Sequence, residues 1–161
     1  MAEFQAHVNQ ALRNLTTLSK INKFIEDSWD WQVTTSYYVG VHIMNAHIAK
    51  TANLHYNTHD KVKNALYNQL SPAKIDQNIY LDYGKLENLS RRARYLCSDT
   101  NTTQSTVAHL THDVHLKRAL QKLDTIMEYM AKLHSITFPI TDIDCIEIKS
   151  LTLKYFKYVK N

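Results

Sequence analysis

An arginine cluster at residues 91–94 has the residue types and spacing best suited to chemistry on an anionic ligand. Arg91 and Arg94 lie three residues apart, and Arg91 and Tyr95 lie four apart, so on a helix their side chains are neighbours. A guanidinium group binds phosphate through paired hydrogen bonds, and a tyrosine ring stacks on a nucleobase. Helical geometry places Tyr95 nearly opposite Leu86 on the apolar face. The alternative is that the arginines join helices through ion pairs near a helix C-terminus, where cations are favoured.

Three of the nine histidines are candidates for acid–base chemistry, namely His42, His55 and His59. Imidazole takes up and releases a proton near neutral pH, as a general acid or base must. His42 shares a helical stripe with Tyr38 and Asn45, a set that would form either a hydrogen-bonded core network or the lining of an interface groove. His59 is expected just inside a helix N-terminus, where an ordinary capping role is the alternative.

The histidine spacing does not favour a metal centre. His109, His112 and His115 follow at three-residue steps, so the first and third diverge by roughly 120° around a helix. A complete site would need a further ligand, such as His55 or His59. No His-Glu-x-x-His motif is present. We therefore expect neither a metal nor a cofactor, and keep as an alternative a bundle with three histidines on separate helices, as in DinB-like proteins.

The composition limits the fold class. The chain has 161 residues with only two glycines and two prolines. That length suits one domain, and an all-β fold would need many more turn residues. We therefore expect an all-α, up-and-down bundle of about five helices.

Charge and cysteine content limit the compartment and the partners. The net charge is +4, a mild basic excess compatible with nucleic acid binding. The two cysteines, Cys97 and Cys145, cannot build a disulfide framework. No signal peptide is apparent, and no apolar run approaches the ~20 residues of a membrane span. These features predict a soluble cytoplasmic protein that does not contact a membrane.

Apolar residues recurring every three or four positions predict the helices. The second helix is apolar on more than one face and is expected to be central in the bundle. Residues 99–103 are expected to form a polar loop. After Pro139 the apolar residues partly alternate, so residues 139–161 are an extension whose structure, strand or last helix, stays open; it is expected to pack on the domain of residues 1–138. The expected helices are 2–26, 31–53, 58–69, 75–97 and 106–134.

Two segments carry a family resemblance. The first, residues 30–42, reads Asp-Trp-Gln-Val-Thr-Thr-Ser-Tyr-Tyr-Val-Gly-Val-His, and the second, residues 86–95, reads Leu-Glu-Asn-Leu-Ser-Arg-Arg-Ala-Arg-Tyr. Together they resemble the HEPN family, small helical bundles of prokaryotic toxin–antitoxin and defence systems. The resemblance implies a HEPN-like bundle and a role with RNA, because many members are ribonucleases and others bind RNA or partners without cutting. On this basis Tyr38, with Arg91, Arg94 and Tyr95, is expected to contact RNA.

The ribonuclease signature of that family, an Arg followed by a His four to six residues later, is absent. None of the five arginines has a histidine within the next seven residues. The sequence therefore favours an RNA-binding or accessory protein without efficient catalysis. The alternative is a divergent, metal-independent endoribonuclease that uses His42, His55 or His59. The resemblance also implies a homodimer, expected through the second and fourth helices, and a nucleotidyltransferase-type antitoxin as partner.

Overall fold

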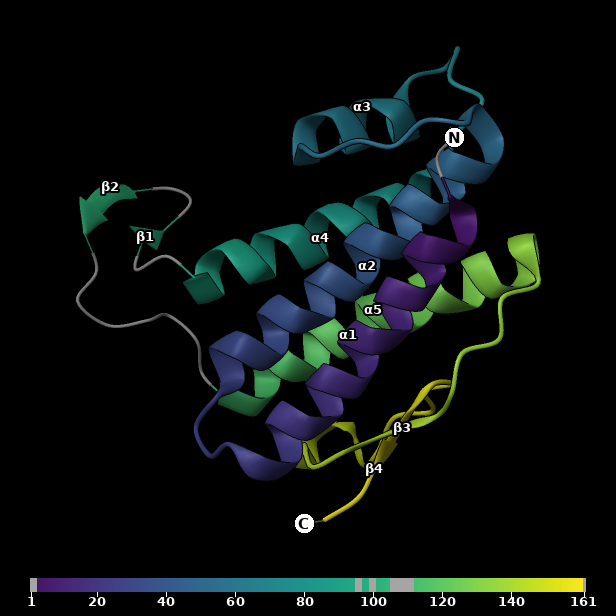
Figure 1. The fold of residues 1–161 in the computed structure, drawn as a ribbon. Coiled ribbons are helices and arrows are strands. Elements are labelled where there is room, and N and C mark those ends of the chain that lie inside the picture. The colour runs from purple at the N-terminus through teal and green to yellow at the C-terminus, as the bar shows by residue number, and fades with distance from the viewer. Residues whose placement is uncertain (1–2, 95–96, 99–100, 105–111, 161) are drawn as a thin grey trace.

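Four long helices form an up-and-down bundle, and a short fifth helix lies over one end of it. The computed structural model describes residues 3–94, 97–98, 101–104 and 112–160. Figure 1 shows the long helices running alternately up and down, with α3 across the top. An all-α bundle of five helices, as the sequence predicted, is confirmed. The helices are α1 (Phe4–Phe24), α2 (Trp29–Ala52), α3 (His59–Tyr67), α4 (Gln77–Arg94) and α5 (His112–His134).

Helix α2 is the centre of the bundle, as its apolar sequence predicted. It packs against α1, α3, α4 and α5, and most of its side chains are buried. At Gly40, an added Cβ would lie only 3.2 Å from the Leu86 side chain of α4. The absence of a side chain at Gly40 therefore lets α4 lie close against α2.

The end of α4 differs from the expected one. The helix is described as far as Arg94, and Cys97, to which it was predicted to continue, lies in a strand instead. Strand β1 (Cys97–Ser98) pairs antiparallel with β2 (Asn101–Gln104), which overlaps the segment 99–103 expected to be a loop. The threonine-rich sequence explains the difference, because β-branched side chains favour extended backbone over helix. Residues 106–111, which were predicted to open the fifth helix, lie outside the described residues, and α5 is described from His112.

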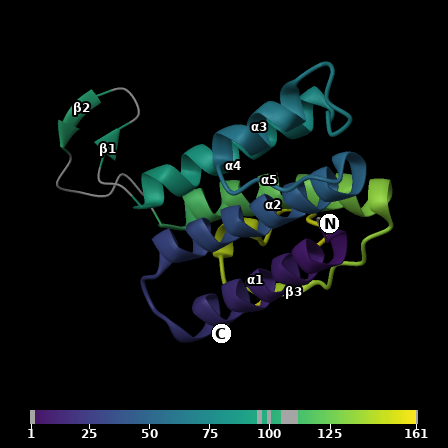
Figure 2. The same cartoon turned by 45° about the horizontal axis from the view of Figure 1, so that its top comes forward.

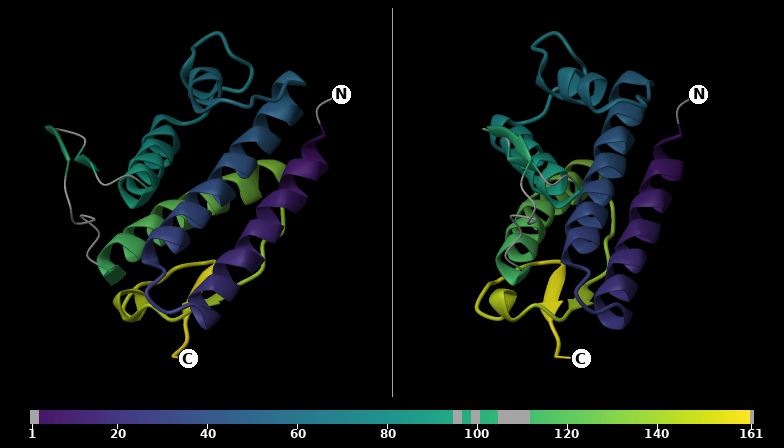
Figure 3. Two further views of the ribbon diagram at one scale, coloured as in Figure 1. Left: turned by 60° about the vertical axis from the view of Figure 1, so that its left-hand side comes forward. Right: turned by 90° about the vertical axis from the view of Figure 1, so that its left-hand side faces the viewer.

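The C-terminal extension contains two short strands. β3 (Thr141–Ile143) and β4 (Phe156–Tyr158) pair in parallel, with the 3₁₀ turn Ile146–Ile148 between them. The strand, one of the two possibilities left open by the sequence, is therefore the observed structure. Figure 3 shows this segment at one end of α1 and α5.

Side-chain hydrogen bonds from α1 and α5 attach the extension to the bundle. The Asn22 side chain of α1 donates to the Asp144 carbonyl and accepts its backbone N–H, at 3.1 and 2.8 Å. The buried Asp124 carboxylate of α5 accepts the backbone N–H groups of Lys154 and Tyr155, at 3.1 and 2.8 Å. Among the described helices, none is both long and apolar enough to cross a membrane.

Candidate anion-binding groove

A cavity of about 570 Å³ lies between α3 and α4 and brings together three of the residues singled out from the sequence. His59 comes from the first turn of α3, and Arg91 and Arg94 come from the last two turns of α4. Figure 2 shows α3 lying alongside α4. Residues of these two helices form the two walls of the cavity. We call this cavity the α3–α4 groove. Its lining residues are Asn57, Thr58, His59, Asp60, Lys63, Glu87, Arg91 and Arg94.

The wall on α4 is one stripe of the helix. Glu87, Arg91 and Arg94 follow at i, i+4 and i+7, so their side chains share a face. The Arg94 Nε donates to the Ser90 carbonyl at 3.3 Å, one turn back. Arg91 and Arg94 lie in the last turn of α4, where the helix macrodipole favours positive charge.

An ion pair joins the two walls. Lys63 of α3 lies 3.1 Å from the Glu87 carboxylate, and Glu87 is only 8% exposed. Burial alone would lower the pKa of Lys63, but its hydrogen bond to Glu87 and the nearby acidic charges outweigh that effect and raise the pKa. Lys63 is therefore charged at neutral pH, and it lies within ion-pair distance of the buried Glu87 carboxylate. The second pair of Lys63, with the exposed Asp60 at 3.7 Å, contributes little.

The His59 side chain is held in position by a hydrogen bond to the buried Tyr37. The Tyr37 hydroxyl lies 2.8 Å from His59 Nδ1, and the two rings are 5.3 Å apart. Burial raises the pKa of Tyr37, so the phenol keeps its proton at neutral pH. If the phenol accepts from Nδ1–H, then Nε2 carries the lone pair of a general base; if it donates, Nε2 carries the proton of a general acid. The contact thus leaves Nε2 as the ring nitrogen for a ligand in the groove.

Aromatic residues continue beneath and beside this contact. Tyr37 packs against Tyr83 and Tyr38, with ring centroids 5.8 Å away in each case. The Tyr83 hydroxyl is buried. Tyr38 is 37% exposed, so it is accessible near the groove. Tyr95, the fourth residue expected to contact RNA, lies outside the described residues.

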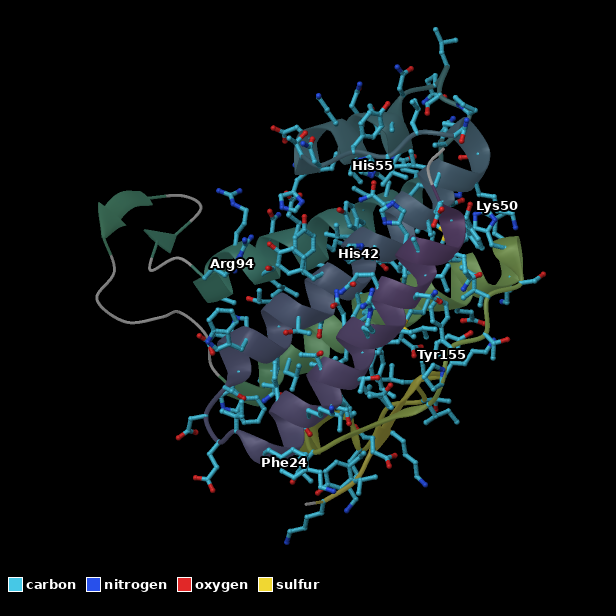
Figure 4. All side chains as sticks on the ribbon, in the orientation of Figure 1. Phe24, His42, Lys50, His55, Arg94 and Tyr155 are labelled. Carbon is cyan, nitrogen blue, oxygen red and sulfur yellow. The ribbon has the colours of Figure 1, made fainter. Side chains whose placement is uncertain are left out.

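His42 and His55 lie elsewhere, in a histidine cluster with His7 of α1. The Nδ1 atoms of His7 and His42 are 3.5 Å apart, and the His55 ring is 5.9 Å from that of His7. Burial, followed by the neighbouring histidine charges, lowers the pKa of both His7 and His42. Figure 4 shows His42 and His55 away from Arg94, which lies near the end of α4.

The expected network of His42, Tyr38 and Asn45 does not form. Asn45 is buried and accepts the backbone N–H of Tyr56 at 3.1 Å, which holds the chain after α2. His42 contacts His7 instead. The stripe was correctly placed on α2, but Asn45 bonds to Tyr56, His42 contacts His7, and Tyr38 packs on Tyr37.

The structure describes only part of the set of histidines considered for a metal. His109 lies outside the described residues, as does the His112 side chain, and His115 is buried in the bundle. In the part of the chain that the structure describes, no group of three or more His, Cys, Asp or Glu side chains could hold a metal ion.

Lys63 and Glu87 of the groove, and Tyr37, which contacts His59, were not among the candidate site residues. The four-residue spacing from Glu87 to Arg91 was a usable signal, because it places an acid and a base on one face. The position of Lys63 opposite Glu87 depends on how α3 folds back, which no local pattern reveals.

Comparison of the chain with protein-family models, with curated proteins and with solved structures found no match. The function of the groove therefore has to follow from its own residues. Two guanidinium groups, an ammonium group and an imidazole meet around one open cavity, a set suited to binding a phosphate and moving a proton next to it.

Proposed function

We propose that the chain is a HEPN-like RNA-binding or accessory protein of a defence or toxin–antitoxin system, and that RNA phosphate binds in the α3–α4 groove. The observation that carries the proposal is that Arg91 and Arg94 of α4 line the same cavity as His59 of α3, which is far from them in the sequence. Arginine forks match the geometry of phosphate oxygens.

The charges and the aromatic residues of the groove support RNA over a small neutral ligand. Glu87 is already paired with Lys63, so binding an anion at the arginines does not leave that carboxylate uncompensated. The exposed ring of Tyr38, packed on Tyr37 below His59, offers a stacking surface close to the phosphate site.

Assembly with a second copy or with a nucleotidyltransferase-type antitoxin belongs to the same proposal. Trp31 is 62% exposed and Tyr38 37% exposed, and a spacing of seven residues places them on one face of α2. Exposed aromatic residues at helical spacing are typical of interface anchors. A homodimer through α2 and α4 would bring two grooves close to each other. The proposed location of this assembly is the cytoplasm.

A second candidate function is metal-independent endoribonuclease activity, favoured by the contact between Tyr37 and His59. In this mechanism His59 Nε2 takes the proton of a ribose 2′-hydroxyl, and the 2′-oxygen attacks phosphorus. The bond from phosphorus to the 5′-oxygen breaks and that oxygen takes a proton from water, giving a 2′,3′-cyclic phosphate and a 5′-hydroxyl end, while Arg91 and Arg94 stabilise the extra negative charge. The protonated His59 then releases its proton to water.

Binding of labelled single-stranded RNA at several salt concentrations tests the proposal. The variant Arg91→Gln/Arg94→Gln should bind more weakly, with the logarithmic salt slope reduced by about 0.7 for each lost phosphate contact. A matched control is Lys20→Gln/Lys157→Gln, which removes the same charge from exposed positions outside the groove. If the arginine variant binds RNA as the wild type does but melts much earlier, the arginines only hold the bundle together.

Cleavage is tested separately with the same RNA and the variant His59→Gln. A 2′,3′-cyclic phosphate product formed by the wild type in the presence of a chelator, and absent with the variant, supports the nuclease. If the RNA stays intact after prolonged incubation with the wild type, the nuclease is refuted, and the proposed function is RNA binding without catalysis.

A further inference from the structure

A second basic cavity lies on the other side of α4, between α4 and α5. It has a volume of about 240 Å³, and we call it the α4–α5 cavity. Figure 3 shows α4 running between α3 and α5, so the same helix borders both the groove and this cavity. The lining residues are Lys85, Asn88, Leu89, Arg92, Arg118 and Lys122.

Helical spacing explains why these cations meet. Lys85 and Arg92 are seven residues apart on α4 and share a face, and Arg118 and Lys122 are four apart on α5. The Asp82 carboxylate forms ion pairs with two of them, at 2.9 Å from Lys122 Nζ and 3.7 Å from Lys85 Nζ. Four cations thus line one cavity, and Asp82 is in ion-pair contact with two of them.

The two cavities are linked by the end of α4. Consecutive residues on a helix differ in direction by about 100°, so Arg91 lines the groove while Arg92 lines the α4–α5 cavity. The ridge between them carries the exposed Asn88 together with Arg91. The basic surface therefore continues across the exposed face of α4 rather than stopping at the groove.

Basic side chains dominate the lining of both cavities. The two cavities are lined by seven lysines and arginines, with Asp60 and Glu87 also in the lining and Asp82 in ion-pair contact with Lys85 and Lys122. A surface lined in this way attracts a polyanion.

From this continuity we propose that one single strand of RNA crosses the exposed face of α4, with phosphates in both the α3–α4 groove and the α4–α5 cavity. The inference rests on the proposed function and extends it. The ligand is an RNA segment that spans a helix about 10 Å wide, not a mononucleotide. Leu89 and the aliphatic stem of Arg92 would contact the sugar of the crossing strand.

The test compares two pairs of substitutions on one binding reaction with a twelve-nucleotide single-stranded RNA. Lys85→Gln/Arg118→Gln changes only the α4–α5 cavity, at two exposed positions, and Arg91→Gln/Arg94→Gln changes only the groove. Each pair should lower the logarithmic salt slope by about 1.4, since each lost phosphate contact contributes about 0.7. The control Lys20→Gln/Lys157→Gln should leave the slope unchanged, and titration should give one strand per protomer.

The outcomes separate this inference from the proposed function. A loss of binding in the Arg91/Arg94 variant with none in the Lys85/Arg118 variant overturns the crossing strand and leaves the groove as the RNA site. Two strands bound independently per protomer would overturn it as well, because the cavities would then be separate sites. No RNA binding by the wild type would refute both proposals together.

Discussion

A buried histidine pair should make the stability of the bundle depend on pH. His47 Nε2 faces the Ala73 carbonyl at 3.0 Å and therefore carries the proton. Its Nδ1 is then an acceptor, 2.8 Å from His134 Nε2. Both rings are neutral in this arrangement. Burial, with the nearby charges of His47 and Lys50 adding to it, lowers the pKa of His134 to about 4.

The unfolded chain takes up the proton more readily than the folded one. In the unfolded state His134 has its ordinary pKa of 6.5. Stability is therefore complete above pH 6.5 and is lost as the pH falls toward 4, because the unfolded state binds more protons across that interval. The full shift would correspond to about 3.4 kcal/mol, but the ring is partly open to solvent, so we expect about 1–2 kcal/mol. The lowered pKa of His47 acts in the same direction.

Urea denaturation between pH 7.5 and pH 5 measures this loss. The variant His134→Gln keeps an N–H donor for His47 but does not titrate. The wild type should lose about 1 kcal/mol more than the variant by pH 5. If both proteins lose the same free energy of unfolding over this interval, the pair does not couple stability to pH and the argument fails.

Two further substitutions test contacts described above. Asp124→Asn should lower the free energy of unfolding by about 1–3 kcal/mol, because an amide cannot accept from the N–H groups of both Lys154 and Tyr155; urea denaturation checks this, and a change below about 0.5 kcal/mol would contradict it. Tyr37→Phe keeps the aromatic packing but removes the partner of His59. It should cost about 1 kcal/mol and shift the His59 ring signals more than those of the other histidines in NMR spectra, and unchanged His59 signals would show that the contact is absent in solution.

The helices could be predicted from sequence because their signals are local. The apolar positions of α1, such as Leu15 and Leu18, recur at helical spacing and are buried as expected. The extension could not be predicted in this way. Ile140 and Ile143 look alike in the sequence, yet Ile140 is exposed and Ile143 is buried. Their difference depends on pairing with Phe156–Tyr158, a contact between distant segments.

The candidate site was predictable only in part, for the same reason. The arginines of α4 share a face through spacing alone, so Arg91 and Arg94 could be grouped in advance. His59 could be proposed for its chemistry but not distinguished from His42 and His55. What distinguishes it is the return of α3 over α4, which is a tertiary arrangement.

The groove has one wall that depends on the rest of the molecule for its own structure. Helix α3 has nine residues, and isolated helices below roughly 12–15 residues are marginal in water. It is held by burial of Val62 and Leu66 and by the contacts of His59 and Lys63 with α2 and α4. Opening of α3 and unfolding of the bundle are therefore separate equilibria. A ligand bound in the groove would suppress the opening of α3 far more than the unfolding of the bundle. Binding would therefore be detected as increased order in this one short helix.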